Sequence, residues 1–183
     1  YIAWTDIQNT PTNEFHAVVH NTYKSLYQEQ RKQLRFIHLV SPSIDKFHVI
    51  GQNRKDLPIE RMLFHYIGYG YPTSNDGTIF IRDSRTQQFV NFKIKKLLKL
   101  MKNPSFYIFD CDYAGKFIDS ISKGYTAISE KNSNKNKAAF NYDDWLCLCA
   151  TNDDEKLLSD RNLPRDFLSS CLLSPIDMSL LCH

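Results

Sequence analysis

The sequence predicts an α/β fold in which a largely parallel central sheet carries helices on both faces and a small β-hairpin projects from it. Apolar runs of strand length alternate along the chain with segments of helical period, as in parallel sheets joined by right-handed crossovers. Two of these runs, at 61–67 and from 105 onward, end on glycine or polar residues, as parallel strands do where sites are built. With 183 residues the chain can bury a core of ordinary size, so we predict a single domain over residues 1–183.

The first part of the chain is expected to fold as helix, strand, helix and strand. Residues 12–30 carry apolar side chains at three- and four-residue spacing after Pro11, which predicts an amphipathic helix. A strand is predicted over 34–40 and a shorter helix over 43–54. The apolar strand over 61–67 follows them.

A hairpin and a lysine-rich helix are predicted between the two long apolar runs. The runs 78–82 and 88–92 alternate in polarity around a polar tip, which indicates two short antiparallel strands. From Phe92 onward, apolar residues share one face of a predicted helix and lysines occupy the other. These lysines are Lys93, Lys95, Lys96, Lys99 and Lys102. We interpret them as a solvated face; the alternative is a docking surface for an acidic partner.

In the last third of the chain, the residue pattern predicts further helices and one more strand. A helix is expected over 114–123, followed by a mobile polar loop over 129–141 that is too poor in apolar residues to order itself. Residues 144–150 predict a strand and 163–172 a helix. Another helix should begin at Ser174, which can cap it ahead of Pro175.

Composition excludes several classes of protein. The formal net charge is only +3 with charges of both signs interspersed, so we expect no nucleic-acid partner, and no apolar run is long enough to span a membrane. The five cysteines include no Cys-x-x-Cys pair, which is consistent with a reducing cytosol. Cys147 and Cys149 share one face of the strand over 144–150, and we interpret them as small apolar residues rather than metal ligands. Because the chain opens on Tyr1 rather than methionine, we expect it to be a fragment of a longer protein.

The ends of the two long strands are the candidate site. The first carries Gly68-Tyr69-Gly70 where cysteine peptidases of the caspase and separase kind carry His-Gly, and the second carries Cys111 followed by Asp112. A cysteine nucleophile needs a base that removes its proton, and a tyrosine with an ordinary pKa near ~10 is a poor one. Asp112 should raise the thiol pKa further, so these positions predict an inert sulfur. Gly68 and Gly70 either form an oxyanion site or permit a strand-end turn, and we favour the turn.

His65 is the histidine nearest to this site in the sequence. It lies four residues before Tyr69, roughly 13 Å along an extended strand, and is therefore expected to be too deep to act as the missing base. We interpret it as a hydrogen-bonded core histidine. The sequence predicts neither a cofactor nor a metal site.

Three motifs in this chain resemble the N-terminal, caspase-like domain of the Raptor family of TOR-associated regulatory proteins. Residues 64–72 (Phe-His-Tyr-Ile-Gly-Tyr-Gly-Tyr-Pro) are similar to the family's Phe-His-Tyr-Asn-Gly-His-Gly-x-Pro, and 109–115 (Phe-Asp-Cys-Asp-Tyr-Ala-Gly) resemble Tyr-Asp-Cys-Ser-Asn-Ala-Gly. Residues 163–176 resemble Leu-Pro-Ala-Asp-Leu-Phe-Thr-Ser-Cys-Leu-Thr-Thr-Pro-Ile. The resemblance covers the chain from about Ile2 to its end and implies a caspase-like three-layer fold.

The resemblance also implies a function and partners. In the family this domain is a non-peptidase scaffold that presents substrates with a TOR-signalling motif, a short Phe-led acidic-hydrophobic peptide, to the TOR kinase. It implies helical repeats and a WD-type propeller elsewhere in the same protein, a cytoplasmic location, and a role that allows recruitment to the lysosomal or vacuolar surface. The motifs do not identify the peptide-binding residues.

This chain departs from the family pattern at the dyad. Tyr69 replaces the family's usual histidine, and Asp112 and Tyr113 replace small residues, so Tyr69 and Cys111 are degenerate dyad positions and Gly70 and Cys111 relic oxyanion positions. We therefore expect an inactive scaffold. The alternative is an active caspase- or separase-like peptidase that uses Cys111 with an unconventional base.

Overall fold

The computed structural model describes residues 17, 20–27, 36–55, 62–72, 77–101, 105–133, 145–158 and 167–182. The chain separates into two compact units, one formed by residues 41–157 and the other by residues 1–40 together with 158–183. The single domain over 1–183 stays a prediction. None of the described helices is both long and apolar enough to cross a membrane.

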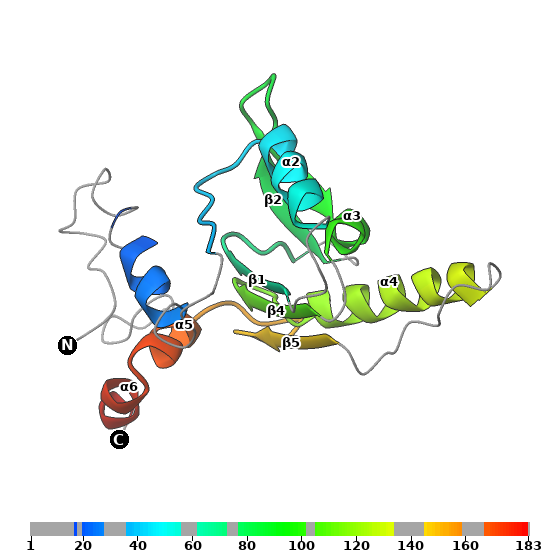
Figure 1. The fold of residues 1–183 in the computed structure, drawn as a ribbon. Helices are drawn as coiled ribbons and strands as arrows, with labels where there is room; N and C mark the ends of the chain where they lie inside the picture. Colours follow the sequence, from blue (N-terminus) through cyan, green and yellow to red (C-terminus); the bar gives the residue numbers. More distant parts are fainter. Residues whose placement is uncertain are drawn as a thin grey trace. The chain divides into compact units, whose positions relative to one another are not determined.

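The larger unit contains a three-stranded parallel sheet in the order β1-β4-β5 (Figure 1). Its strands are β1 (Met62–Ile67), β4 (Ser105–Asp110) and β5 (Trp145–Cys149). The register aligns Ile67 of β1 with Asp110 of β4, so both strands end at the same edge of the sheet. The predicted parallel strands over 61–67, from 105 and over 144–150 are confirmed to within a residue.

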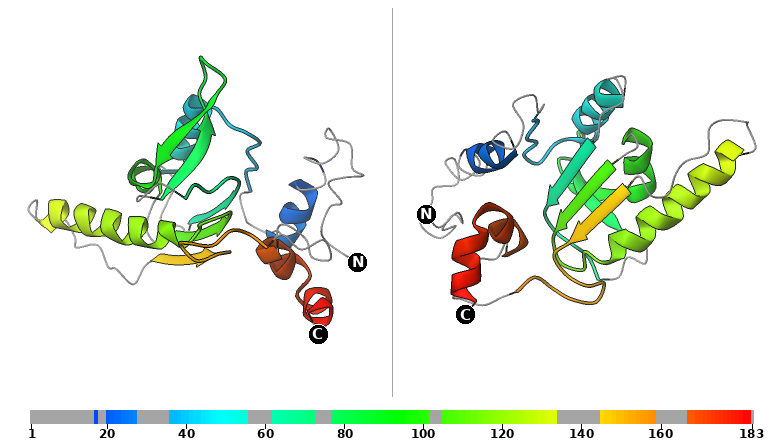
Figure 2. Two further views of the ribbon diagram at one scale, coloured as in Figure 1. Left: turned by 180° about the vertical axis from the view of Figure 1, so that it is seen from behind. Right: turned by 60° about the horizontal axis from the view of Figure 1, so that its bottom comes forward.

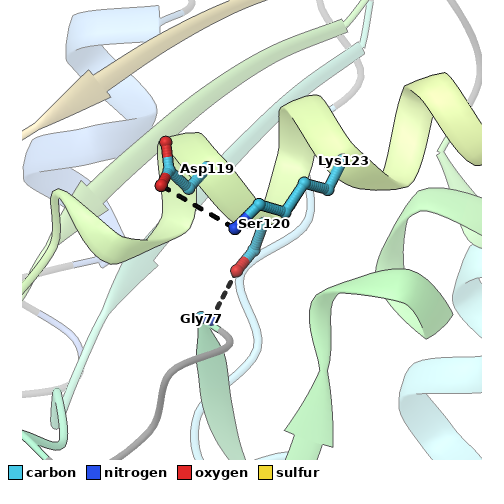
Figure 3. Close-up of polar contacts among 4 residues, drawn as sticks. All are labelled: Gly77, Asp119, Ser120 and Lys123. Carbon is cyan, nitrogen blue, oxygen red and sulfur yellow. Dashed lines mark hydrogen bonds and ion pairs between the residues drawn. The ribbon is translucent and has the colours of Figure 1, made fainter.

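The predicted hairpin is present as β2 (Thr78–Arg82) and β3 (Phe89–Lys93), which pair antiparallel. Asp83 stabilises the start of the turn because one of its carboxylate oxygens accepts bonds from the backbone N–H groups of Arg85 and Thr86, at 2.9 and 2.8 Å. At the other end of β2, the N–H of Gly77 donates to the Ser120 hydroxyl at 2.5 Å, close to the Asp119–Lys123 ion pair on α4 (Figure 3).

The helices of the larger unit are α2 (Ile44–Lys55), α3 (Ile94–Leu100) and α4 (Lys116–Ser133). In α3 the predicted division is confirmed, because Ile94, Leu97 and Leu98 are buried while the described lysines are exposed. Leu100 is also buried, although its position lies off the predicted apolar stripe.

Two predictions around α4 were wrong. The helix does not end near residue 123, and residues 129–133 belong to it rather than to the predicted mobile loop over 129–141. The physical reason is the continued three- and four-residue spacing of Ile121, Tyr125 and Ile128, which bury one face of the helix in the core. Residues 134–141 lie outside the described residues.

Helix α4 runs alongside the strands of the sheet (Figure 2). Aromatic side chains of the sheet and of α4 belong to one buried core. Phe109 of β4 stacks on Phe117 of α4 with ring centroids 4.0 Å apart and planes 3° from parallel. About two helical turns further along α4, Tyr125 shares a hydrogen bond of 2.6 Å with Tyr107 between their hydroxyl groups. These two pairs fix the helix against the central strand.

The smaller unit contains a helix over residues 20–27, together with α5 (Phe167–Leu173) and α6 (Pro175–Leu181). Ser174 occupies the N-cap position of α6 and Pro175 follows it, as predicted. The helical prediction over 12–30 holds for the residues of that range that are described.

The predicted strand over 34–40 was wrong for its described part, because residues 36–40 are not in a strand. A strand must form backbone hydrogen bonds to a neighbouring strand, and none of the described strands pairs with residues 36–40. Its side chains instead lie against the helix over 20–27, with the Phe36 ring 5.5 Å from His20 and 6.1 Å from Tyr27. An apolar run alone does not distinguish these two environments.

Replacing Phe117 by alanine is expected to lower the free energy of unfolding by about 3–5 kcal/mol, because the ring is 2% exposed and stacks on Phe109. Urea denaturation measures this loss. Phe89→Ala is the control, since Phe89 is 54% exposed and its removal should change stability by no more than about 0.5 kcal/mol. Equal losses in the two variants would contradict the core described above.

Candidate functional site

The candidate site is built from the two loops that leave β1 and β4 at the same edge of the sheet. Residues 68–72 follow β1 and residues 111–115 follow β4, and the paired strands bring the loops together. The N–H of Gly68 donates to the carbonyl oxygen of Asp110 at 3.4 Å, which continues the pairing one step past the strands. The structure therefore brings the predicted positions Tyr69, Gly70, Cys111 and Asp112 to one end of the sheet.

Gly70 allows the two loops to approach each other closely. A β-carbon built on Gly70 would lie 1.5 Å from the backbone carbonyl oxygen of Asp112 and 2.5 Å from its carbonyl carbon. Only glycine fits without moving one of the two backbones. This observation supports the structural interpretation of Gly70 over the oxyanion interpretation.

Tyr66 ties the first loop to the hairpin. Its hydroxyl donates to the carbonyl oxygen of Tyr69 at 3.2 Å and accepts a bond of 3.2 Å from the backbone N–H of Phe80 in β2. Burial raises the pKa of Tyr66 to about 12, so the hydroxyl keeps the proton that it donates. The side chain acts as a fixed bridge rather than as an acid or base.

A third loop, after β5, supports the second one and was missed by the sequence analysis. The Thr151 hydroxyl donates to the carbonyl oxygen of Cys111 at 3.1 Å and accepts a bond of 2.9 Å from the N–H of Ala114. The N–H of Tyr113, which has a φ of 54°, donates to the carbonyl oxygen of Glu155 at 2.7 Å. The polar run after the strand over 144–150 could have indicated this loop, because a third parallel strand ends there too.

Cys111 is completely buried, with 0% of its surface exposed. Burial raises the pKa of its thiol well above the ordinary value, and the nearby Asp110, Cys149 and Asp112 raise it further. Each of these groups disfavours the thiolate, so the sulfur is protonated at neutral pH. No histidine is among the groups that perturb it in the described part of the chain.

Tyr69, the other predicted dyad position, and Asp112, the predicted disabling neighbour, have other roles. Tyr69 is 76% exposed, and in the described structure no hydrogen bond joins its side chain to Cys111. Asp112 accepts a bond of 2.7 Å from the backbone N–H of Leu157, which fixes the end of the third loop. The Asp112 carboxylate therefore holds the third loop by a hydrogen bond and also raises the pKa of the Cys111 thiol.

His65 lies on the face of the sheet opposite to the aromatic core. It aligns with Ile108 in the register, whereas Phe64 and Tyr66 align with the core residues Tyr107 and Phe109. Burial lowers the pKa of His65 to about 4, so the imidazole is neutral at pH 7. His65 is half-buried and is not part of the aromatic core, so its interpretation as a hydrogen-bonded core histidine stays a prediction.

Beside the second and third loops is an open, polar depression with a volume of about 690 Å³. It is lined by the start of α4, including Lys116 and Asp119, and by the end of β5 and its loop, including Cys149 and Thr151. Cys111 does not line it. In the described part of the chain, no three histidine, cysteine or acidic residues are grouped as a metal site would require.

Comparison with known proteins identifies the family. Residues 1–121, well over half of the chain, match the family model described as the Raptor N-terminal CASPase-like domain. The chain belongs to this family. The Raptor resemblance is thereby confirmed, and the matched residues include the first two sequence motifs, at 64–72 and 109–115.

Curated Raptor relatives match nearly the whole chain. It is 27% identical over 190 residues to the Target of rapamycin complex 1 subunit mip1 of Schizosaccharomyces pombe, covering 98% of this chain and 14% of that protein. It is 27% identical over 181 residues to Regulatory-associated protein of TOR 1 of Arabidopsis thaliana, covering 97% of this chain and 13% of that protein. The chain thus spans about one seventh of the length of these Raptor proteins.

The crystal structure of Chaetomium thermophilum Raptor has the same fold. It superposes with a TM-score of 0.84 at 24% identity, covering 97% of this chain and 17% of that one. The predicted caspase-like α/β fold is therefore confirmed, including its largely parallel sheet with helices.

Replacing Gly70 by alanine is expected to destabilise this Raptor domain by about 1–3 kcal/mol or more, because the new methyl group would overlap the Asp112 backbone. Chemical denaturation measures the change. Tyr69→Ala, at the exposed neighbouring position, should stay within about 0.5 kcal/mol of the natural chain. A stable Gly70→Ala variant would show that the two loops do not approach as described.

The stability of the larger unit is expected to fall as the pH drops from about 6.5 to about 4. The His65 pKa is lowered by folding, so the unfolded chain binds more protons in this window and protonation favours unfolding. The effect is fully absent above pH 6.5, and below pH 4 it reaches at most about 3 kcal/mol. Denaturation curves at several pH values measure it, and His65→Gln should flatten the slope in this window. An unchanged slope would contradict the buried, neutral imidazole.

Proposed function

We propose that this chain is a catalytically inactive scaffold domain of a Raptor-type subunit of TOR complex 1, which helps recruit substrate peptides to the TOR kinase. The observation that carries the proposal is the state of Cys111 in a chain of the Raptor family. The motif resemblance assigns this sulfur to the position of a peptidase nucleophile, yet it is fully buried and its surroundings hold the proton on it.

The chemistry of peptide cleavage argues for the same proposal. A nucleophilic cysteine must reach a carbonyl carbon as a thiolate, and an adjacent base must later protonate the leaving amine. Cys111 has no exposed surface, and Tyr69 projects into solvent without a hydrogen bond to it in the described structure. Both requirements are therefore unmet by the residues at the dyad positions.

The proposed partners come from the relatives. The fission yeast protein is named as a subunit of Target of rapamycin complex 1, and the Arabidopsis protein as regulatory-associated protein of TOR. We extend this association to the present chain and propose the TOR kinase, substrates with a TOR-signalling motif, and the helical repeats and propeller of its own full-length chain as its partners. A cytoplasmic location belongs to the same proposal, and the five free cysteines support it.

The competing function, a peptidase that uses Cys111, has no supporting feature at the described site. It would need the β4 loop to open and expose the sulfur. That loop is held by the bonds from Thr151 to Cys111, from Ala114 to Thr151 and from Leu157 to Asp112.

The full-length protein is expected to co-purify with the TOR kinase, and Cys111→Ala should leave this association unchanged because the thiol makes no exposed contact. A peptide carrying a cysteine-directed electrophile should fail to label Cys111 at neutral pH. Labelling is measured by mass spectrometry and association by pull-down from cells.

Tyr69→His is the decisive companion variant. It restores the imidazole of the family motif, but Cys111 stays buried, so we expect neither labelling nor peptide cleavage. Stoichiometric labelling of Cys111 in the natural chain would overturn the inactive assignment. Loss of TOR association in a folded Cys111→Ala variant would overturn the scaffold assignment.

A further inference from the structure

Strand β5 carries two cysteines that lie side by side. Cys147 and Cys149 are separated by one residue, so both side chains project from the same face of the strand. Their sulfur atoms are 3.7 Å apart, within hydrogen-bond distance for sulfur, and both residues are half-buried. The sequence pattern alone indicates only small apolar residues at these positions.

One member of this pair is accessible from the polar depression described above. Cys149 lines that depression together with Lys116 and Thr151, whereas Cys147 is not among its lining residues. Cys149 is therefore the member of the pair that lies beside a solvent-open surface.

The contact between the two sulfurs also makes them chemically unequal. When the S–H of Cys147 donates to the Cys149 sulfur, it favours the thiolate of Cys149 and lowers its pKa, although partial burial opposes this effect. The same bond and burial raise the pKa of Cys147. Either sulfur can donate in this contact, and with Cys147 as the donor the thiolate forms on Cys149, the residue that lines the depression.

We propose that Cys149 and Cys147 form a hydroperoxide-reactive dithiol in which Cys149 is oxidised first and Cys147 then closes an intramolecular disulfide. In the first step the Cys149 thiolate attacks hydrogen peroxide: an S–O bond forms, the O–O bond breaks, and the departing hydroxide takes up a proton as water. In the second step the Cys147 sulfur attacks the sulfenic acid, an S–S bond forms, the S–O bond breaks, and a second water leaves. Two thiols are oxidised to one disulfide and one peroxide is reduced to two waters.

The backbone geometry permits this bond and makes it reversible. Alternate residues of a strand have α-carbons about 6.6 Å apart, at the upper end of the 4.4–6.8 Å range found in disulfides. Closing the bond brings the sulfurs from 3.7 Å to about 2.05 Å, and at this α-carbon separation a slight bend of the strand relieves strain in the bond. β5 can bend because, among the described residues, it pairs only with β4 and forms an edge of the sheet. A strained disulfide has a more oxidising potential and is readily reduced by cellular thiols.

The chain provides its own comparison thiols. Cys182 is exposed and its sulfur lies outside the pair, while Cys111 is fully buried. If exposure alone decided reactivity, Cys182 would be oxidised first. If the contact between the two sulfurs decides reactivity, Cys149 and Cys147 are oxidised first.

The test uses the reduced full-length protein treated with hydrogen peroxide, with remaining thiols then blocked by N-ethylmaleimide. Trypsin cuts after Lys137 and Lys156, so both cysteines are in one peptide, residues 138–156. We expect this peptide to lose two hydrogens and acquire no maleimide several-fold faster than Cys182 is oxidised, and dithiothreitol should reverse the change.

Two single variants separate the roles of the cysteines. Cys147→Ser should stop at a Cys149 sulfenic acid that reacts with dimedone, because no resolving thiol remains. Cys149→Ser should leave Cys147 unreactive at the same peroxide concentration. Far-ultraviolet circular dichroism checks that both variants fold. A further experiment needs no substitution: phenylarsine oxide bridges neighbouring thiols, so it should protect Cys147 and Cys149 of the natural chain from maleimide.

Several outcomes would overturn the proposal. Equal oxidation rates for the pair and Cys182, a disulfide between Cys111 and Cys149, or a disulfide between two protein molecules would each do so. Dimedone labelling of Cys147 rather than Cys149 would overturn the assigned order, and absence of arsenical protection would show that the two sulfurs are not within bridging distance.

Discussion

The burial of strand β4 is the constraint on which the rest of the larger unit depends. This strand is the middle one of the sheet, and its residues from Tyr107 to Asp110 are almost completely inaccessible to solvent. Phe109 stacks on Phe117 and Tyr107 bonds to Tyr125, so the same strand also fixes the position of α4. Because Cys111 directly follows this strand, it is buried with it, and its thiol is protonated as a consequence.

The loops at the end of the sheet show why this caspase-like site is rigid. Gly70 lets the loop after β1 contact the backbone of the loop after β4. Thr151, in the loop after β5, donates a hydrogen bond to the loop after β4. Tyr66 connects the first loop to the hairpin. Most of these interactions involve backbone groups, so the loop architecture does not depend on which side chain occupies position 69.

Elements that depend on local residue spacing were predicted from the sequence, and those that depend on contacts between distant segments were not. Strands β1, β4 and β5, the hairpin and the lysine-bearing face of α3 were predicted, because each is encoded in the spacing of apolar residues within a short segment. The end of α4 and the segment 36–40 were not, since Ile128 and Phe36 are placed by what they pack against. Thr151 was missed because its contribution is a hydrogen bond to a residue 40 positions earlier.

The sequence by itself determined the family, the alternation of strands and helices, and which residues occupy the predicted dyad positions. Those properties depend on the order and type of residues that are neighbours in the sequence. Only the tertiary structure decided that Cys111 has no exposed surface, that Gly70 meets the Asp112 backbone, and that Cys147 and Cys149 hold their sulfurs 3.7 Å apart beside an open depression. Burial and atomic proximity arise from the packing of segments that are distant in the chain, and no local pattern specifies them.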